Sequence, residues 1–194
     1  MDLYAGKDIR MTADTHREEN GQGHTTAISK RGAASVTGKE SSLTMTAGKD
    51  IHLQAARISS AGDMTIAGKR QVELGTAVAE KDNRVTWDRS NDRRDSTAME
   101  TGSTLTAGRN LTVENGKEIT DLEEHHRHKE KGLLSSKTTT TYDEVKRTDT
   151  TGSIVEGDTL TMTAGKDISL TGSVAASTKE TALSAGRNIS IHAA

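Results

Sequence analysis

Leu43-Thr44-Met45-Thr46-Ala47-Gly48-Lys49-Asp50-Ile51-His52-Leu53 is the stretch that decides the fold of this chain. Apolar and polar residues alternate on both sides of the glycine, as they do in strands that bury one face. We expect the glycine to mark a corner where φ can be positive, and an aspartate two residues later suits a turn. The stretch therefore predicts two short strands that meet at a corner.

The same corner recurs along the chain. The block Ala-Gly-(Lys/Arg)-(Asp/Asn)-(Ile/Leu) is found at five places, and residues 67–72 hold a degenerate sixth copy. The separations of successive glycines are 42, 20, 40, 57 and 21 residues, close to one, two or three times a period near 20. A period of this length is typical of one coil of a β-solenoid. The corner glycines are Gly6, Gly48, Gly68, Gly108, Gly165 and Gly186.

The composition favours a narrow, layered interior. Only 31% of the residues are hydrophobic and 2% are aromatic, so the bulky aromatic side chains of a globular core are largely missing. The chain contains no proline, as expected where nearly every backbone N–H joins a strand ladder. We predict an all-β, right-handed parallel β-helix with coils of about 20 residues. Residues 1–194 are expected to be one segment of a much longer protein.

Stacked coils place equivalent residues above one another at a spacing of about 4.8 Å. Leu43, Leu105 and Leu160 are expected in one inward column. A second inward column is expected to hold Ile51, Leu111, Ile168 and Ile189. The corner cations should stack too, with their repulsion partly offset by Asp8, Asp50 and Asp167, and these cations are Lys7, Lys49, Lys69, Arg109, Lys166 and Arg187.

Three polar stretches interrupt the repeat, at approximately 14–42, 80–103 and 121–158. We expect them to leave the helix as hairpins or loops on one side, which in repeat proteins is often the interacting face. Trp87, Leu133 and Leu134 are the candidate partner contacts within them. The alternatives are that Trp87 packs at the base of its hairpin and that the two leucines pack against a neighbouring hairpin.

The corners, the Thr-rich run at 138–153 and the stretch 157–168 resemble filamentous-haemagglutinin repeats over essentially the whole chain. Such repeats occur in exoproteins of two-partner secretion systems, including haemagglutinin adhesins and CdiA-type effectors of contact-dependent growth inhibition. The resemblance implies a secreted protein at the bacterial cell surface, exported in full length through an outer-membrane secretion partner. It implies a structural role in delivering a toxin to neighbouring bacteria, through the target-cell envelope. The alternative is an adhesin segment that binds a host-cell glycan or receptor.

Several other functions are not expected. The formal net charge of −2 argues against nucleic acid as a partner, and the absence of cysteine excludes disulfides and thiolate metal sites. His125, His126 and His128 have no identifiable third ligand, so we predict neither a metal nor a cofactor. One aspartate per corner is turn chemistry rather than a pair of catalytic carboxylates, so no enzyme is predicted. Raw sheet ends make end-to-end self-association possible.

Overall fold

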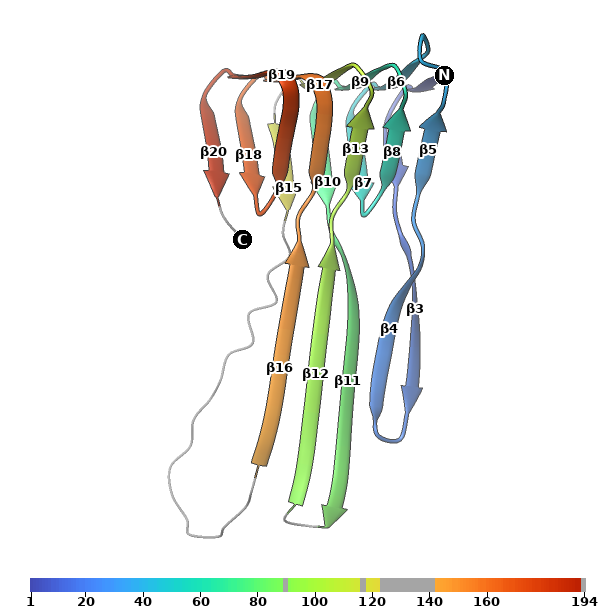
Figure 1. The fold of residues 1–194 in the computed structure, drawn as a ribbon, viewed down its shortest axis with the longest axis vertical. Helices are drawn as coiled ribbons and strands as arrows, with labels where there is room; N and C mark the ends of the chain where they lie inside the picture. The colour runs from blue at the N-terminus through green and yellow to red at the C-terminus, as the bar shows by residue number, and fades with distance from the viewer. Residues whose placement is uncertain (89–90, 116–117, 123–141, 193–194) are drawn as a thin grey trace.

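The computed structural model describes residues 1–88, 91–115, 118–122 and 142–192. Every regular element in this part of the chain is a strand, and the strands coil into a solenoid from which further strands project (Figure 1). The predicted all-β parallel solenoid is therefore confirmed. Leu43 pairs with Met64, so one coil without a projection spans 21 residues.

Each coil lays one strand on each of three faces, and equivalent strands of successive coils pair in parallel (Figure 1). The first face holds β1 (Asp2–Ala5), β6 (Ser42–Ala47), β9 (Asp63–Gly68), β14 (Asn110–Asn115) and the C-terminal parts of β17 (Ile154–Ala164) and β19 (Val174–Ala185). The second face holds β2 (Ile9–Met11), β7 (Asp50–Gln54), β10 (Gln71–Gly75), β15 (Glu118–Leu122), β18 (Asp167–Thr171) and β20 (Asn188–His192). The third face holds β5 (Ala33–Val36), β8 (Arg57–Ser60), β13 (Thr104–Ala107) and the N-terminal parts of β17 and β19.

Aliphatic side chains from the three faces fill the interior in columns. Their burial removes apolar surface from water at about 25 cal/mol per Å², the main favourable contribution to folding. The column of the first face is Leu43, Met64, Leu111 and Leu160, each at most 1% exposed. The columns of the second and third faces include Ile51, Val72 and Ile168, and Ile58, Leu105 and Val155.

Two members of the predicted columns were assigned wrongly. Leu105 lies on the third face, between Ile58 and Val155, and Leu111 lies on the first face. The cause is the block at 107–111, which forms the corner between the third and first faces, because Ala107 pairs with Ser60. Both corners require a small residue, a glycine and a polar turn residue, so the motif and its spacing do not distinguish them.

At Gly48, Gly108 and Gly186 the corner glycine is required by close stacking on the preceding coil rather than by φ. Among the described residues, only Ala55 and Gly172 have a positive φ, of 48° and 62°. At Gly48, an added Cβ would lie 2.2 Å from the carbonyl oxygen of Gly6 in the preceding coil. A side chain there would push neighbouring coils apart, so the predicted reason for the glycine was wrong although its position at a corner was right.

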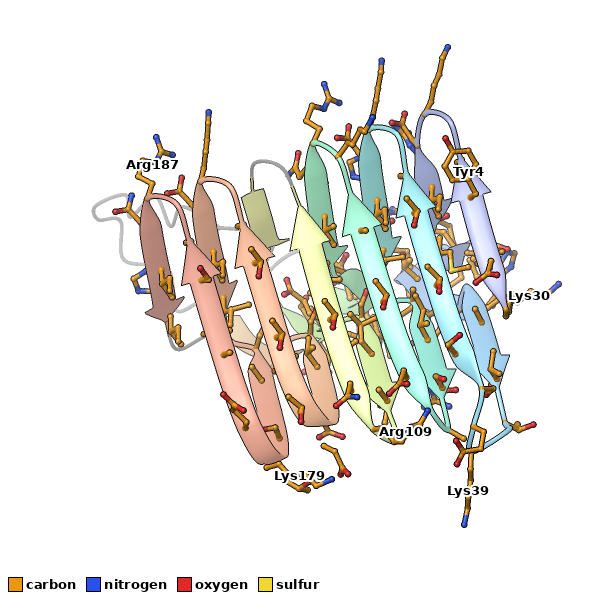
Figure 2. The ribbon with its side chains drawn as sticks, turned by 90° about the horizontal axis from the view of Figure 1, so that it is seen from above. Tyr4, Lys30, Lys39, Arg109, Lys179 and Arg187 are labelled. Atoms are coloured by element: carbon orange, nitrogen blue, oxygen red, sulfur yellow. The ribbon has the colours of Figure 1, made fainter. Side chains whose placement is uncertain are left out.

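Ion pairs join successive coils at the corners. Asp50 is 3% exposed and accepts a hydrogen bond of 2.7 Å from Nε of Arg70. Asp63 likewise lies 2.9 Å from Arg109 in the next coil, and Asp167 pairs with Arg187 at the rim visible in Figure 2. Each carboxylate therefore sits beside the cation of the following coil, which relieves the repulsion expected of stacked cations. Arg70, not the predicted Lys69, is level with Lys49 in the column of corner cations, and Arg109 lies outside this column, at the corner between the third and first faces.

Candidate functional site

A further, five-stranded sheet projects from a single corner of the solenoid (Figure 1). It contains the hairpins β3 (Asp14–Asn20) with β4 (Gly23–Lys30) and β11 (Ala77–Asp88) with β12 (Asn91–Thr101), and the strand β16 (Tyr142–Thr151). Their order is β16-β12-β11-β4-β3. We call these five strands the hairpin sheet. The bounds predicted for the polar stretches, 14–42, 80–103 and 121–158, stay predictions. Among the described residues, the strands that project are these five.

The register shows that every projection starts at the same step of a coil, between the second and third faces. Gly75 pairs with Gln54 and with Leu122, and Leu122 is level with Thr171. In the coils of Gln54 and Thr171 the chain goes directly to the third face through one residue of positive φ, Ala55 or Gly172. In the coils of β2, β10 and β15, strands of the hairpin sheet stand between this step and the third face. The solenoid can therefore carry or omit a projection without changing its own path.

Buried serines hold this corner together. Ser103 and Ser153 are both 0% exposed and stack in successive coils. The Ser103 hydroxyl donates to the carbonyl oxygen of Leu53 at 2.7 Å and accepts from the backbone N–H of Ala56 at 3.1 Å. The Ser103 N–H donates to Oγ of Ser153 at 3.2 Å. The projecting strands thus leave and return through a corner fixed by hydrogen bonds in three successive coils.

The sequence analysis missed this corner, although a signal for it exists. The triplet Thr-Gly-Ser occurs at 101–103, 151–153 and 171–173, and each copy is the return to the third face. Gly102 and Gly152 stack so closely that a Cβ on Gly102 would lie 2.4 Å from the carbonyl carbon of Gly152. A second repeat with separations of 50 and 20 residues would have located the corner that carries the projections.

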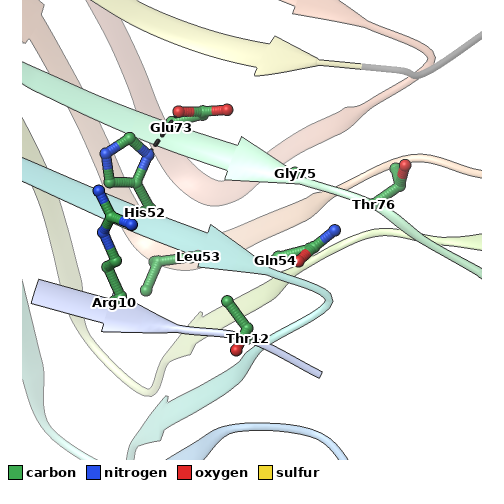
Figure 3. Close-up of a pocket in the computed structure, with 8 residues that line it drawn as sticks. All are labelled: Arg10, Thr12, His52, Leu53, Gln54, Glu73, Gly75 and Thr76. Carbon is green, nitrogen blue, oxygen red and sulfur yellow. Dashed lines mark hydrogen bonds and ion pairs between the residues drawn. The ribbon is translucent and has the colours of Figure 1, made fainter. Parts of the chain in front are cut away.

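A shallow groove of 350 Å³ lies on the second face beside this corner (Figure 3). Arg10, His52 and Glu73 follow one another across three coils along its wall. Nδ1 of His52 lies 2.5 Å from a carboxylate oxygen of Glu73. Glu73 is the one carboxylate that lines the groove, so the pair of carboxylates needed for general acid–base hydrolysis is not formed there.

The sequence-predicted contact residues fall at different places. Trp87 lies in β11 at the register irregularity between Thr86 and Asp88, at the outer end of the hairpin rather than at its base. Leu133 and Leu134 lie outside the described residues, as do His125, His126 and His128. Within the described ranges, no three side chains of His, Asp or Glu form a group that could hold a metal ion. The contact roles of Trp87 and the two leucines stay predictions.

Comparisons with known proteins agree with this architecture. The family model described as hemagglutinin repeat matches residues 132–194. The chain is 25% identical over 229 aligned residues, 99% of its length, to the tRNA nuclease CdiA of Escherichia coli strain STEC_O31. It is 37% identical over 95 residues, 46% of its length, to the 16S rRNA endonuclease CdiA of Enterobacter cloacae subsp. cloacae.

Residues 132–194 thus match a hemagglutinin repeat, and the chain is similar to CdiA proteins along its length. The chain spans only 7% and 3% of the lengths of these two CdiA proteins, so the nuclease names describe proteins far longer than this chain. No solved structure matches the chain. In the part of the chain that the structure describes, no helix is long and apolar enough to cross a membrane.

Proposed function

We propose that this chain is a structural and delivery segment of a large secreted exoprotein at the bacterial cell surface, most directly one of contact-dependent growth inhibition. The single observation that carries the proposal is the match to a CdiA protein along 99% of the chain. In the full-length protein, the segment would be exported through an outer-membrane secretion partner. Its own residues contribute a rigid stack of coils and perform no catalysis.

Within this role, we assign contact with the envelope of the target cell to the hairpin sheet. All projections leave from one corner, so the sheet faces one direction whatever the number of coils. The solenoid holds the sheet through buried serines and backbone pairing rather than through a flexible linker. A partner bound by the sheet would therefore be held at a fixed distance from the solenoid.

The test measures binding of the fluorescently labelled chain to intact bacteria, with a host-cell and glycan panel beside it. The matched variant deletes residues 76–101, which joins Gly75 to Gly102 as Thr171 joins Gly172 in a coil without a projection. We expect saturable binding to bacteria that this deletion abolishes, while circular dichroism still shows a strand-rich fold. Binding to host cells or glycans alone would transfer the proposal to an adhesin, and binding that survives the deletion would remove β11 and β12, the centre of the hairpin sheet, from the contact.

A further inference from the structure

Adjacent projections in the hairpin sheet are not equally spaced. β12 and β16 leave from consecutive coils and pair over ten residues, beginning at the solenoid with Thr101 and Thr151. β4 and β11 leave from coils that are separated by the bare coil of Ala55. They pair only at 23–26 with 80–83, away from the solenoid.

The bare coil leaves room for one strand at the base of the sheet. Strands two coils apart are separated by about 10 Å, twice the spacing of about 4.8 Å between hydrogen-bonded neighbours. In the described structure, no pairing joins residues 27–30 of β4 to residues 77–79 of β11, although each segment pairs with its own hairpin partner on the other side. Two strand edges therefore face each other across a gap that is about one strand wide at the solenoid and closes toward the pairing of Thr26 with Glu80.

A groove of 680 Å³ lies at this gap, lined by both edges. Ile28, Ala79 and Met99 supply apolar surface, and Met99 is 53% exposed. Methionine is flexible and adapts to partners of varied shape. Arg31 closes the end of the groove at the solenoid, where it donates to the carbonyl oxygens of Ala55 at 2.6 Å and Gly102 at 2.8 Å. The groove thus has one end fixed by the hydrogen bonds of Arg31, and on its two sides lie strand edges that do not pair with each other.

The charges around the groove indicate the partner. Lys30, Arg31 and Lys81 line it, against one carboxylate, Glu80. Nε2 of His24 lies 3.6 Å from that carboxylate. The excess of positive charge favours an acidic ligand. Backbone edges recognise an extended peptide by strand addition, while pockets for alternate side chains supply the selectivity.

We propose that the groove between β4 and β11 binds an extended, acidic segment of a partner protein as an inserted strand of about four residues, since residues 27–30 are the longer free edge. β4 and β11 are antiparallel, so the inserted strand runs parallel to one and antiparallel to the other. This inference rests on the proposed contact role of the hairpin sheet and names the chemistry of the partner.

The probe is the acetylated, amidated hexapeptide Glu-Thr-Val-Thr-Val-Glu, titrated into the isotopically labelled chain and followed by NMR. We expect shifts and slowed hydrogen exchange at the amides of 27–30 and 77–79. A peptide N-methylated at alternate residues, which cannot pair with one edge, should leave these amides unchanged. Met99→Glu should weaken binding about tenfold or more, whereas Val174→Glu, at a similarly exposed residue of the solenoid, should leave it within about twofold.

Three results would overturn the inference. The first is no shift at millimolar peptide, and the second is shifts confined to the end strands β1 and β20. The third is shifts at the groove that grow with protein concentration in the absence of peptide, which would make a second copy of the chain the occupant. The peptide titration is independent of the cell-binding test. Peptide binding without cell binding contradicts the proposed function alone, and cell binding without peptide binding contradicts this groove alone.

Discussion

Replacing Ser103 with alanine tests whether buried hydrogen bonds hold the corner that carries the projections. The side chain is 0% exposed, and its hydroxyl bonds most closely to two backbone groups, the carbonyl of Leu53 and the N–H of Ala56, with a longer contact of 3.3 Å to the carbonyl oxygen of Gly75. A buried polar group that loses its partner costs about 1–3 kcal/mol, so two such groups together cost on the order of 3 kcal/mol. Alanine is smaller than serine by one oxygen and introduces no clash, so the loss of hydrogen bonds is the main effect.

The measurement is the free energy of unfolding in urea, followed by circular dichroism, with hydrogen exchange at the Ala56 amide as the local readout. Ser59→Ala is the matched control, because the Ser59 hydroxyl bonds only to Ser35 on the exposed third face, at 2.9 Å. We expect the control to change the free energy by less than about 0.5 kcal/mol. If Ser103→Ala is equally neutral and exchange at Ala56 is unchanged, the serines do not stabilise this corner.

Four further predictions concern the solenoid. Leu53→Asp should cost on the order of 5 kcal/mol and abolish the cooperative melting transition, because it puts an unpaired charge at a residue 1% exposed; an unchanged melting curve would show that Leu53 does not face the core. Gly172→Ala should lower the free energy of unfolding by about 1–2 kcal/mol, since its φ of 62° disfavours a Cβ, and urea titration measures this. The hydrogen bond from Arg70, with a smaller contribution from nearby cations, lowers the pKa of Asp50 below its ordinary value. The ionised Asp50 carboxylate therefore stabilises the folded state above about pH 4, and this stabilisation is lost as the pH falls through the lowered pKa of the folded state. Because Asp50→Asn cannot titrate, its Tm should fall less on acidification than that of the wild type. Ile191, 63% exposed on the last strand, should promote end-to-end association, and sedimentation of Ile191→Lys at increasing concentration should show a smaller fraction of oligomer, whereas equal fractions would exclude this end.

The strands and the first corner were predictable because their physical cause is local. Alternation from Leu43 to Leu53 fixes which side chains point inward, and the structure buries Met45, Ile51 and Leu53 as expected. The assignment of coils was less predictable, because two different corners accept the same residues. The block at 107–111 satisfies the motif, while in its own coil the first face ends at Asn115 and the second face begins at Glu118. Only the pairing of Ala107 with Ser60 separates the two.

The tight turn of positive φ shows a different limit. Gly172 is a usual choice for such a turn, but Ala55 adopts the same conformation in its coil with a φ of 48°. A left-handed conformation costs an ordinary residue about 1–2 kcal/mol. Ala55 is fully buried, and Arg31 from the preceding coil donates to its carbonyl oxygen. Tertiary contacts impose this conformation, so local sequence preference gives no sign of it.

The order of bare and projecting coils determines the form of the hairpin sheet. Where projections leave consecutive coils, their strands begin at the native spacing and pair from the base, as Thr101 does with Thr151. Where a bare coil intervenes, the strands begin two spacings apart and must converge before they can pair, which leaves a groove beneath. The Thr-Gly-Ser triplets locate this corner in the coils of Gly102, Gly152 and Gly172, whereas the bare coil of Ala55 has no such triplet and is identified by its strand pairing. We therefore expect a groove of this kind wherever one bare coil lies between two coils with hairpins, and none between consecutive projecting coils.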